Sequence, residues 1–518
     1  MLKNYLKTAV RNLLREKGSA MINLAGLTLG ITCSLVLFLL VSFLRSYDDF
    51  HARRDRIYRV VSQSQGNDGL TFQGGVPSVL PAAFRTDFPE AEAVVFTSYR
   101  AETVVTIPQP AGEPKKFKEE AGVVYTEPSF FEIFDRKIVT GEARAGLDEP
   151  NEAIIAQSLA KKFFGNEDVI GEVVQVEDRQ YVVRAVMEDA PRNTDLPFQL
   201  MLSYITIKKE REDNGWNSTW SDEQCFFLLK EGESIEKLKS RMPAFSKKYV
   251  GADDADGTQY LPQPLTELHF DDRFSTYSYS STSKGMLRVL SVVACILVIS
   301  ACINFINLTT AEAIKRSKEV GIRKTLGSSR AQLITQFLGE TSLVTITAVI
   351  FSLGLAQLVL TFINPFMELS LTLNLTTNIL LWIYLLTVTV IVSLLSGLYP
   401  AFVVSGFKPA IALKNQISNR NASGYYLRRA LVVLQFCISQ VFIIGTIVIV
   451  KQMNYFQQKD LGFAKDAIVV VPIPEIENPT DSQQGNSKMR TLREELSQLA
   501  GVERASLSNT PPASDNIS

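Results

Sequence analysis

Histidine and cysteine, the side chains that most often hold metals or carry out catalysis, are scarce in this sequence of 518 residues. The two histidines, His51 and His269, are far apart, and neither has a second ligand at a metal-binding spacing. No pair of nucleophile and base is recognisable either. We therefore expect no catalytic residue, no metal site and no bound cofactor, and we do not expect an enzyme.

The five cysteines cannot form a disulfide framework, because four of them lie inside long apolar runs. These four are Cys33, Cys295, Cys302 and Cys437. Cys225 is the one cysteine outside the runs, and we expect it to be buried rather than reactive.

Charge is absent from five long stretches, although 21% of all residues are charged and the net charge is −1. About 20 apolar residues suffice to cross the hydrocarbon core of a bilayer. The charge-free stretches are 21–44, 289–308, 342–363, 379–404 and 430–450. Five such runs predict a membrane protein with five spanning helices. The first run is too long for a cleavable signal peptide and should anchor the chain.

Lysine and arginine gather in alternate segments between the runs, which fixes the expected orientation. They are abundant in 1–17, in 315–330 and in 408–429, whereas 364–378 has none. The positive-inside rule places the basic segments in the cytoplasm. We therefore predict an inner-membrane, multi-pass protein with a cytoplasmic N-terminus and an extracytoplasmic C-terminus.

The predicted division of the chain follows from the runs and their orientation. It is 1–20 cytoplasmic amphipathic helix, 21–44 first span, 45–285 extracytoplasmic domain, 286–308 second span, 309–341 cytoplasmic segment, 342–363 third span, 364–378 short extracytoplasmic loop, 379–404 fourth span, 405–429 cytoplasmic loop, 430–450 fifth span, and 451–518 the start of a second extracytoplasmic domain.

The region 45–285 reads as mixed α and β. Short alternating runs at 93–96 and 103–107 predict strands, and 171–188 predicts a hairpin. Apolar residues at helical spacing predict a helix over 152–164 that ends at Gly165. The expected fold is thus an α-helical transmembrane bundle with a large mixed α/β domain between the first two spans.

A weak internal repeat is visible, because basic residues, a span and polar sequence recur from Lys414 onward. Beyond the fifth span we predict a strand at 467–472, a helix at 488–499 and a second strand at 502–507. The expectation is an incomplete second extracytoplasmic domain, in a truncated or split gene product or a fragment.

Polar side chains within the spans are few. Carriers coupled to ions or protons usually place charged residues in their spans, and none is present here. For Asn304, Asn307 and Gln357 we expect hydrogen bonds between helices.

The segment 310–340 predicts two short helical pieces. Gly327 can end one helix, and Ser329 with Gln332 forms a capping box for the next. On charge alone, two interpretations are open: a surface for an acidic partner, or a solvated loop whose lysines and arginines only set the topology.

Several motifs together resemble FtsX-like permeases of the MacB type. In 310–340 they are Glu319-Val320-Gly321-Ile322-Arg323-Lys324-Thr325-Leu326-Gly327 and Gln336-Phe337-Leu338-Gly339-Glu340. At the fourth span they are Ser396-Gly397-Leu398-Tyr399-Pro400-Ala401-Phe402 and Lys408-Pro409. In the α/β region they are Phe50-His51, Arg56-Ile57-Tyr58-Arg59-Val60, Ser129-Phe130-Phe131-Glu132-Ile133-Phe134 and Ser158-Leu159-Ala160-Lys161-Lys162-Phe163-Phe164-Gly165.

The resemblance implies the permease subunit of an ATP-binding-cassette complex, in which ATPase-driven motion is relayed to the extracytoplasmic domains. It makes 309–341 a coupling segment for the ATPase. The implied contact residues are Glu319, Gly321, Arg323, Lys324 and Gly327. Family members with four spans dimerise and those with eight carry both halves, so this sequence looks like an eight-span member cut after span five.

The expected partners are a cytoplasmic ABC ATPase and the lipid bilayer. The ATPase is expected as a separate partner because the sequence has no phosphate-binding loop motif. By resemblance, a second permease chain or a missing second half, a periplasmic adaptor and an outer-membrane channel are further candidates; no nucleic acid is expected. The implied substrates are macrolides, antimicrobial peptides or lipoproteins. Two alternatives stay open: a receptor or scaffold that binds an envelope ligand without ATP coupling, and a tethered hydrolase.

Overall fold

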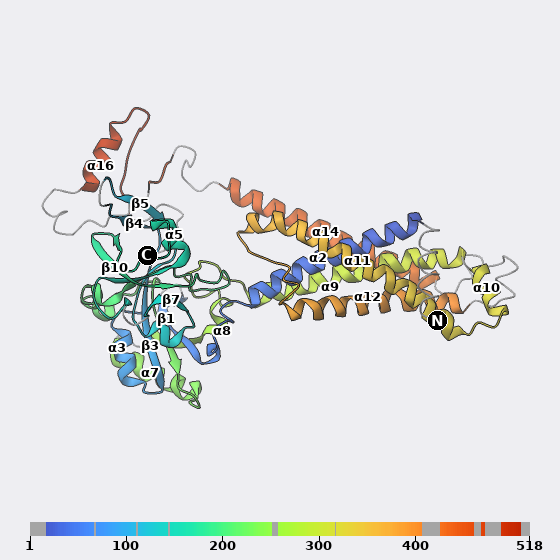
Figure 1. Ribbon diagram of the computed structural model, residues 1–518, viewed down its shortest axis with the longest axis horizontal. Helices are drawn as coiled ribbons and strands as arrows, with labels where there is room; N and C mark the ends of the chain where they lie inside the picture. Colours follow the sequence, from blue (N-terminus) through green and yellow to red (C-terminus); the bar gives the residue numbers. More distant parts are fainter. Residues whose placement is uncertain are drawn as a thin grey trace. The chain divides into compact units, whose positions relative to one another are not determined.

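The computed structural model describes residues 17–66, 69–109, 112–142, 146–250, 257–315, 317–406, 425–459, 468–471 and 488–508 (Figure 1). The predicted amphipathic helix at the N-terminus and most of the loop at 405–429 lie outside these residues. The described chain forms two compact units, one of long helices and one built on a sheet.

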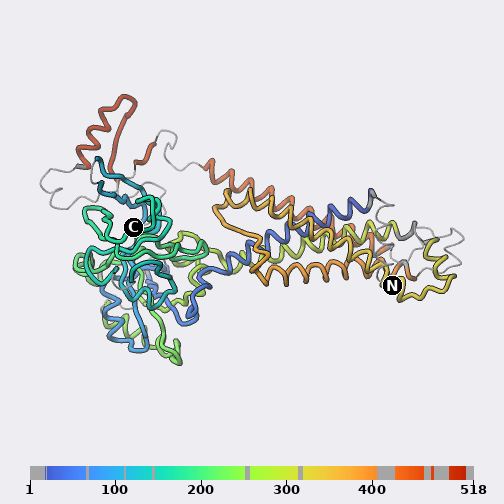
Figure 2. Tube along the Cα trace, in the orientation of Figure 1, coloured from blue at the N-terminus to red at the C-terminus, as the bar shows by residue number. Residues whose placement is uncertain are grey.

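Among the described residues, five helices are long and apolar enough to cross a membrane. They are α2 (Lys17–Arg45), α9 (Lys284–Lys315), α11 (Arg330–Met367), α12 (Ile379–Ser405) and α14 (Tyr425–Gln458). Figure 2 traces them from blue α2 to orange-red α14. The α/β domain is inserted between α2 and α9, which confirms the predicted fold class.

The helical unit packs around α2. Leu27, Ile31 and Leu35 of α2 are buried in one apolar cluster with residues of α9, α11 and α12. Gly26 and Gly30 let α9 approach closely, because a Cβ on Gly30 would lie only 2.6 Å from that of Ala301. Small residues four apart commonly allow such contacts between membrane helices. The predicted hydrogen bond is not made by the side-chain oxygen of Asn307, which is buried without a partner among the described residues. The predicted hydrogen bonds of Asn304 and Gln357 stay predictions.

The α/β domain contains a 13-stranded mixed sheet. Its main path runs β13-β1-β12-β3-β6-β11-β8-β10-β9-β4-β5, with β2 paired to β1 and β7 to β10. The strands are β1 (Ile57–Gly66), β2 (Gly69–Gln73), β3 (Ala91–Arg100), β4 (Thr103–Ile107), β5 (Lys115–Glu119), β6 (Val123–Thr126), β7 (Ile138–Gly141), β8 (Glu152–Ala156), β9 (Val173–Val176), β10 (Arg179–Met187), β11 (Leu200–Ser203), β12 (Glu223–Leu229) and β13 (Thr258–Pro264).

The shorter α-helices in the described part of the chain are α3 (Leu80–Asp87), α4 (Phe130–Ile133), α5 (Gln157–Phe164), α6 (Lys208–Glu212), α7 (Ile235–Val250), α8 (Leu265–Leu268), α10 (Ser317–Thr325) and α16 (Lys488–Ser497). The sheet has a core on each face. Cys225 and Phe227 of β12 point into one core, and Phe226 and Leu228 into the other. Alternate residues of a strand face opposite sides, so the run Cys225–Leu229 of β12 is apolar because both faces of the sheet are covered.

Several local predictions for this domain are confirmed. The hairpin is formed by β9 and β10, which pair antiparallel, and Cys225 is fully buried. One prediction is partly wrong: of the helix expected over 152–164, residues Glu152–Ala156 form the buried strand β8, and only Gln157–Phe164 is helical. Ala153, Ile154 and Ile155 are buried on both faces of the sheet, so the contacts of the sheet override a pattern that also fits a helix. Gly165 ends the helix with φ +80° as predicted.

Beyond the fifth span, the predicted helix is present as α16. The two predicted strands are wrong where they can be checked, because residues 468–471 and 502–507 form no strand.

Candidate functional site

Helix α10 and its junction with α11 form the segment that the sequence marked as the coupling site. At the end of α10, the Ser328 amide donates to the Arg323 carbonyl at 3.0 Å and the Gly327 amide to the Lys324 carbonyl at 3.1 Å. Gly327 has φ +96°. This is a Schellman ending, which needs a residue in the left-handed region and favours glycine there.

The next helix, α11, begins at once with the predicted capping box. The Ser329 hydroxyl accepts from the Gln332 amide at 3.2 Å, and the Gln332 side chain accepts from the Ser329 amide at 2.9 Å. Both donors would otherwise be unsatisfied at the helix start. The geometry of the turn between α10 and α11 is therefore set by hydrogen bonds within the segment.

An apolar contact and a polar chain hold α10 on α11. Val320 of α10 is buried with Leu333 of α11, and Phe337 packs against them. Beside this contact the Arg323 guanidinium donates to Gln336 at 3.1 Å and to Glu319 at 2.5 Å. Gln336 in turn donates to Glu340 at 3.1 Å. These contacts hold α10 against the first turns of α11.

A second set of contacts joins this segment to the end of α12. The Lys324 ammonium donates to the main-chain oxygen of Ser405 at 2.6 Å. Arg330 of α11 donates to the Ser405 hydroxyl at 3.2 Å. Both cations lie at the C-terminus of α12, where the helix dipole favours positive charge. Residues from α10 and α11 thus meet at the last residue of α12.

The five predicted contact residues take different places in this arrangement. Glu319 is exposed and paired with Arg323, whereas Gly321 is buried. Arg323 and Lys324 contact α11 and α12, and Gly327 forms the turn. The structure therefore brings all five into one segment, but gives Arg323 and Lys324 partners within the helical unit.

Two apolar residues of the same segment were missed by the sequence analysis. Ile322 is 49% exposed and Leu326 is 81% exposed. Their spacing of four residues puts them on one side of α10, and Val320 cannot share that side. One short helix cannot bury Val320 together with Ile322 and Leu326, because Val320 lies on another side. The spacing of these apolar residues was therefore the signal that, once Val320 is buried, the pair Ile322 and Leu326 is exposed.

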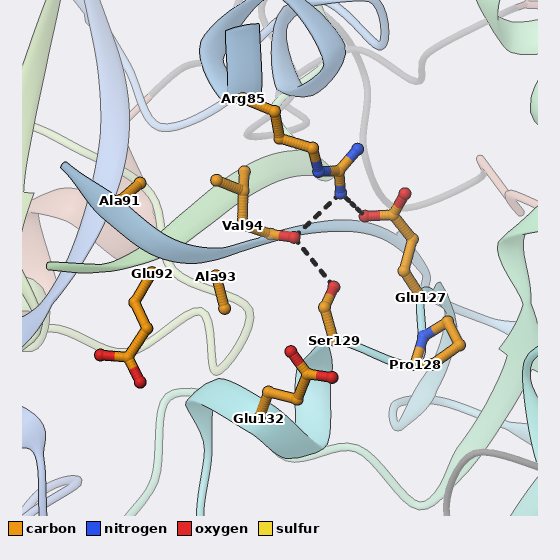
Figure 3. Close-up of a pocket in the computed structure, with 9 residues that line it drawn as sticks. All are labelled: Arg85, Ala91, Glu92, Ala93, Val94, Glu127, Pro128, Ser129 and Glu132. Atoms are coloured by element: carbon orange, nitrogen blue, oxygen red, sulfur yellow. Dashed lines mark hydrogen bonds and ion pairs between the residues drawn. The ribbon is translucent and has the colours of Figure 1, made fainter. Parts of the chain in front are cut away.

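The α/β domain has a pocket of about 460 Å³ lined by residues of α3, β3 and the start of α4 (Figure 3). Arg85 pairs with the Glu127 carboxylate and also donates to the Val94 carbonyl at 2.9 Å. Ser129 donates to the same carbonyl at 2.8 Å rather than to a base. These polar groups bind one another across the pocket wall, so the pocket contributes no activated nucleophile.

Metal ligands do not gather in the described part of the chain, where no group of three or more His, Cys, Asp or Glu side chains could hold an ion. His51 is buried, and its Nδ1 accepts from the Asp135 amide at 3.0 Å. Burial lowers the pKa of His51 to about 4, against a smaller opposing effect of the Asp135 carboxylate. His51 is therefore a neutral structural side chain at neutral pH. His269 stacks on Tyr47 with ring centroids 3.5 Å apart.

Two family models match the chain. Residues 20–245 match the MacB-like periplasmic core domain, and residues 291–409 match the FtsX-like permease C-terminal domain. Together they include four of the five spans, most of the α/β domain and the segment of α10.

Curated relatives with low sequence identity to this chain are also named as ABC transporter permeases or ATP-binding/permease proteins. The chain is 24% identical over 204 residues to an uncharacterized ABC transporter permease, YknZ, of Bacillus subtilis, covering 39% of this chain and 47% of that protein. It is 22% identical over 345 residues to the macrolide export ATP-binding/permease protein MacB of Syntrophobacter fumaroxidans, covering 57% and 47%. The chain spans less than half the length of each of these relatives.

Two solved structures share weak likeness with the α/β domain. A domain of a permease protein from Porphyromonas gingivalis has a TM-score of 0.35 and 20% identity, over 41% of this chain and 91% of that one. The periplasmic region of MacB from Actinobacillus actinomycetemcomitans has a TM-score of 0.29 and 14% identity, over 40% and 88%.

Proposed function

Since the chain belongs to the MacB/FtsX-type ABC transporter permease family, we propose that it is a permease subunit driven by a separate ATPase. The ATPase supplies ATP binding, because the 518 residues contain no phosphate-binding loop motif. It binds α10, and its movement passes through the spans to the α/β domain. The cargo is exported or extracted on the far side of the membrane.

The exposed apolar pair on α10 is the observation that carries this proposal. Ile322 and Leu326 expose much of their surface to solvent, although α10 buries Val320 nearby. A protein partner that covers both side chains removes that apolar surface from water. The short helix then acts as an anchor that enters a groove of the ATPase.

The orientation of the chain supports a cytoplasmic partner. Lysine and arginine are frequent around α10 and absent from 364–378, which follows the next span. By the positive-inside rule α10 is in the cytoplasm and the α/β domain, inserted before α9, is outside. An ATPase in the cytoplasm therefore meets the side of the protein that carries Ile322 and Leu326.

The contacts of α10 provide the relay. Arg323 holds α10 to α11 and Lys324 holds it to the end of α12. A displacement of α10 by the ATPase therefore moves two spans at once, rather than bending a loop. A receptor that works without ATP has no need for a helix fixed to two spans in this way.

The class of cargo follows from the relatives alone. MacB proteins are named for macrolide export, and we propose a substrate of comparable kind: a macrolide, an antimicrobial peptide or a lipoprotein. A periplasmic adaptor and an outer-membrane channel are the further partners that this function implies.

Affinity capture from the host in mild detergent tests the docking site. We compare the wild-type chain with Leu326→Glu, which places a charge on the exposed pair and disturbs no buried contact. The matched control is Leu70→Glu, a change at an exposed leucine of β2 in the α/β domain. Replacing an anchor residue of an interface commonly costs 1 to 2 kcal/mol or more, so we expect about tenfold less ATPase with Leu326→Glu.

The proposal stands if a P-loop ATPase co-purifies with the wild type and the Leu70→Glu control but is reduced about tenfold with Leu326→Glu. Capture of the ATPase by all three chains would move the docking site away from α10. Absence of an ATPase from every sample would favour a receptor or scaffold without ATP coupling.

A further inference from the structure

Four residues, His269–Asp272, interrupt the α/β domain along the chain and belong with the helical unit. Leu268, the residue before them, is buried in a core of the domain, and Tyr277 after them is buried in the same core. The chain then returns to the helical unit at Ser280 and begins α9 at Lys284. The four residues, here called the 269–272 segment, are therefore held by the domain on both sides along the chain.

Within the helical unit, the 269–272 segment is bound to the end of α2 by a row of rings. Tyr47 follows α2 by two residues, and its ring stacks on the imidazole of His269 with centroids 3.5 Å apart and planes 17° apart. Phe43 of α2 meets Tyr47 edge-on, with centroids 5.8 Å apart. Both arrangements are favourable for aromatic rings. His269 is 2% exposed, so its ring is shielded from water.

The main chain of His269 is bound to the start of α9. Its carbonyl accepts from the Thr282 amide at 2.9 Å. The next residue, Ser283, caps α9, because its hydroxyl accepts from the Met286 amide at 3.1 Å. One residue of the 269–272 segment thus contacts the end of the first span through its ring and the start of the second span through its carbonyl.

The connection from α2 into the α/β domain is short. Asp48 is buried and has φ +55°. On the domain side, the Asp135 amide donates to Nδ1 of His51 at 3.0 Å, and the Ala52 amide donates to the Asp135 carboxylate at 2.6 Å. Residues 48–50 alone separate Tyr47 from His51. A connection of this length can act as a hinge, but it is not a long flexible tether.

We propose that the Tyr47–His269 stack is a positioning contact of the relay. It makes the ends of α2 and α9 move the 269–272 segment together, and that segment carries the α/β domain with it. Without the stack, α2 acts on the domain through residues 48–50, and α9 acts on it through the separate connection 273–283. The inference rests on the proposed function in one respect, that an ATPase moves the spans.

Three variants of the full chain test the role of the ring. Tyr47→Ala removes it, and Tyr47→Phe retains the ring without the hydroxyl. The matched control is Phe366→Ala, which removes a ring of the helical unit that is 88% exposed and lies outside the stack. Each variant is prepared in mild detergent beside the wild type.

Hydrogen exchange measures whether the stack holds the 269–272 segment. We expect the peptide that contains Thr282 to exchange about fivefold faster in Tyr47→Ala, the size of effect that loss of one aromatic pair produces. Exchange of that peptide should be unchanged in Tyr47→Phe and in Phe366→Ala. Amides of β12 should exchange equally in all four chains, which reports that the α/β domain is folded.

A contact that only packs the joint would leave the response to nucleotide unchanged, so a second measurement follows motion. Nitroxide labels are attached to p-acetylphenylalanine at two exposed positions, Ile350 of α11 and Glu231 of the α/β domain. In the complex captured with its ATPase, we expect a non-hydrolysable ATP analogue to shift the distance between the labels. The shift should occur in the wild type, Tyr47→Phe and Phe366→Ala, and should be lost in Tyr47→Ala.

Three results would overturn the proposal: an equal shift in Tyr47→Ala and the wild type, unchanged exchange at Thr282 in Tyr47→Ala, or a wild-type complex that keeps its ATPase but shows no shift. Failure of the proposed function gives a different result, because no ATPase is then captured with any chain. The exchange at Thr282 needs no ATPase, and it then decides on its own whether the stack holds the 269–272 segment.

Discussion

The Lys324 ammonium donates to the main-chain oxygen of Ser405 at 2.6 Å, joining two residues 81 positions apart. Arg330 donates to the hydroxyl of the same serine. Through Ser405, the short helix α10 is attached to the end of a span that follows α11. If an ATPase moves α10, this contact decides whether α12 follows.

Removing the Lys324 contact should loosen α10 without removing the docking surface. Lys324→Met keeps the aliphatic stem and deletes the ammonium, and a hydrogen bond to a charged group contributes about 1.5 to 3 kcal/mol. We expect hydrogen exchange of the α10 amides to become about tenfold faster, while capture of the ATPase persists. Unchanged exchange would show that Val320 and Arg323 hold α10 alone.

Gly327 should tolerate asparagine better than valine. A Cβ at this position would meet no other atom within 4 Å, so only the backbone conformation, φ +96°, opposes a side chain. Left-handed conformations cost about 1 to 2 kcal/mol for most residues and less for asparagine. We expect Gly327→Val to speed exchange at the start of α11 several-fold and Gly327→Asn to have a smaller effect. Equal effects of the two variants would contradict a purely conformational role.

Much of this fold was predictable because membrane spans and helix ends leave strong local signals. The charge-free runs locate all five long helices, and Gly327 with Ser329 and Gln332 locates the junction of α10 and α11. The strand β8 was not predictable in the same way. Its residues Ala153, Ile154 and Ile155 are apolar without alternation, and only the neighbouring strands β10 and β11 decide that they are extended.

The candidate site was located but not resolved by the sequence. The motif Glu319–Gly327 locates the segment, but it does not predict that Arg323 and Lys324 contact α11 and α12 or that Leu326 is exposed. Those assignments depend on how α10 packs, through Val320 and Leu333, on a helix that follows it.

Cys225 should be inert to thiol reagents in the folded protein. It is fully buried in β12, and burial raises the pKa of its thiol, so the reactive thiolate is not formed at neutral pH. We expect a membrane-impermeant maleimide to modify the peptide containing Cys225 only after unfolding in denaturant. Rapid modification of the native protein would contradict the packing of β12 between β1 and β3.

Acid should destabilise the α/β domain through His51. Its folded pKa of about 4 is below its ordinary value near 6.5, so between these values the unfolded chain binds a proton that the folded chain does not. The stabilisation is complete above about pH 6.5 and is lost as the pH falls toward 4, by about 3 kcal/mol in total. Tryptophan fluorescence during denaturation measures this slope.

The control for His51 is a variant that cannot gain a proton in this range. His51→Gln retains an acceptor for the Asp135 amide, so its free energy of unfolding should vary less between pH 6.5 and 4 than that of the wild type. Carboxylates titrate equally in both chains, and the difference isolates His51. Identical slopes would mean that another group sets the acid response.

Arg59 should be irreplaceable by lysine in the sheet. Its buried guanidinium donates to Gln263 of β13, to Gln224 of β12 at 2.9 Å and to the Ser275 carbonyl at 2.7 Å. A lysine ammonium cannot reproduce the planar, forked arrangement of the guanidinium donors. We expect Arg59→Lys to lower the free energy of unfolding by about 2 to 4 kcal/mol, measured by denaturant unfolding. A change below about 0.5 kcal/mol would contradict a structural role for the guanidinium.

The most direct test of the central claim, that an ATPase binds α10, is a photo-crosslink from position 326 in host membranes. With p-benzoylphenylalanine in place of the exposed Leu326, the account predicts a covalent product with a P-loop ATPase, and no such product from the same probe at Leu70. A probe at position 326 that labels only water-exposed segments of its own chain, or a protein without a P-loop, would contradict it.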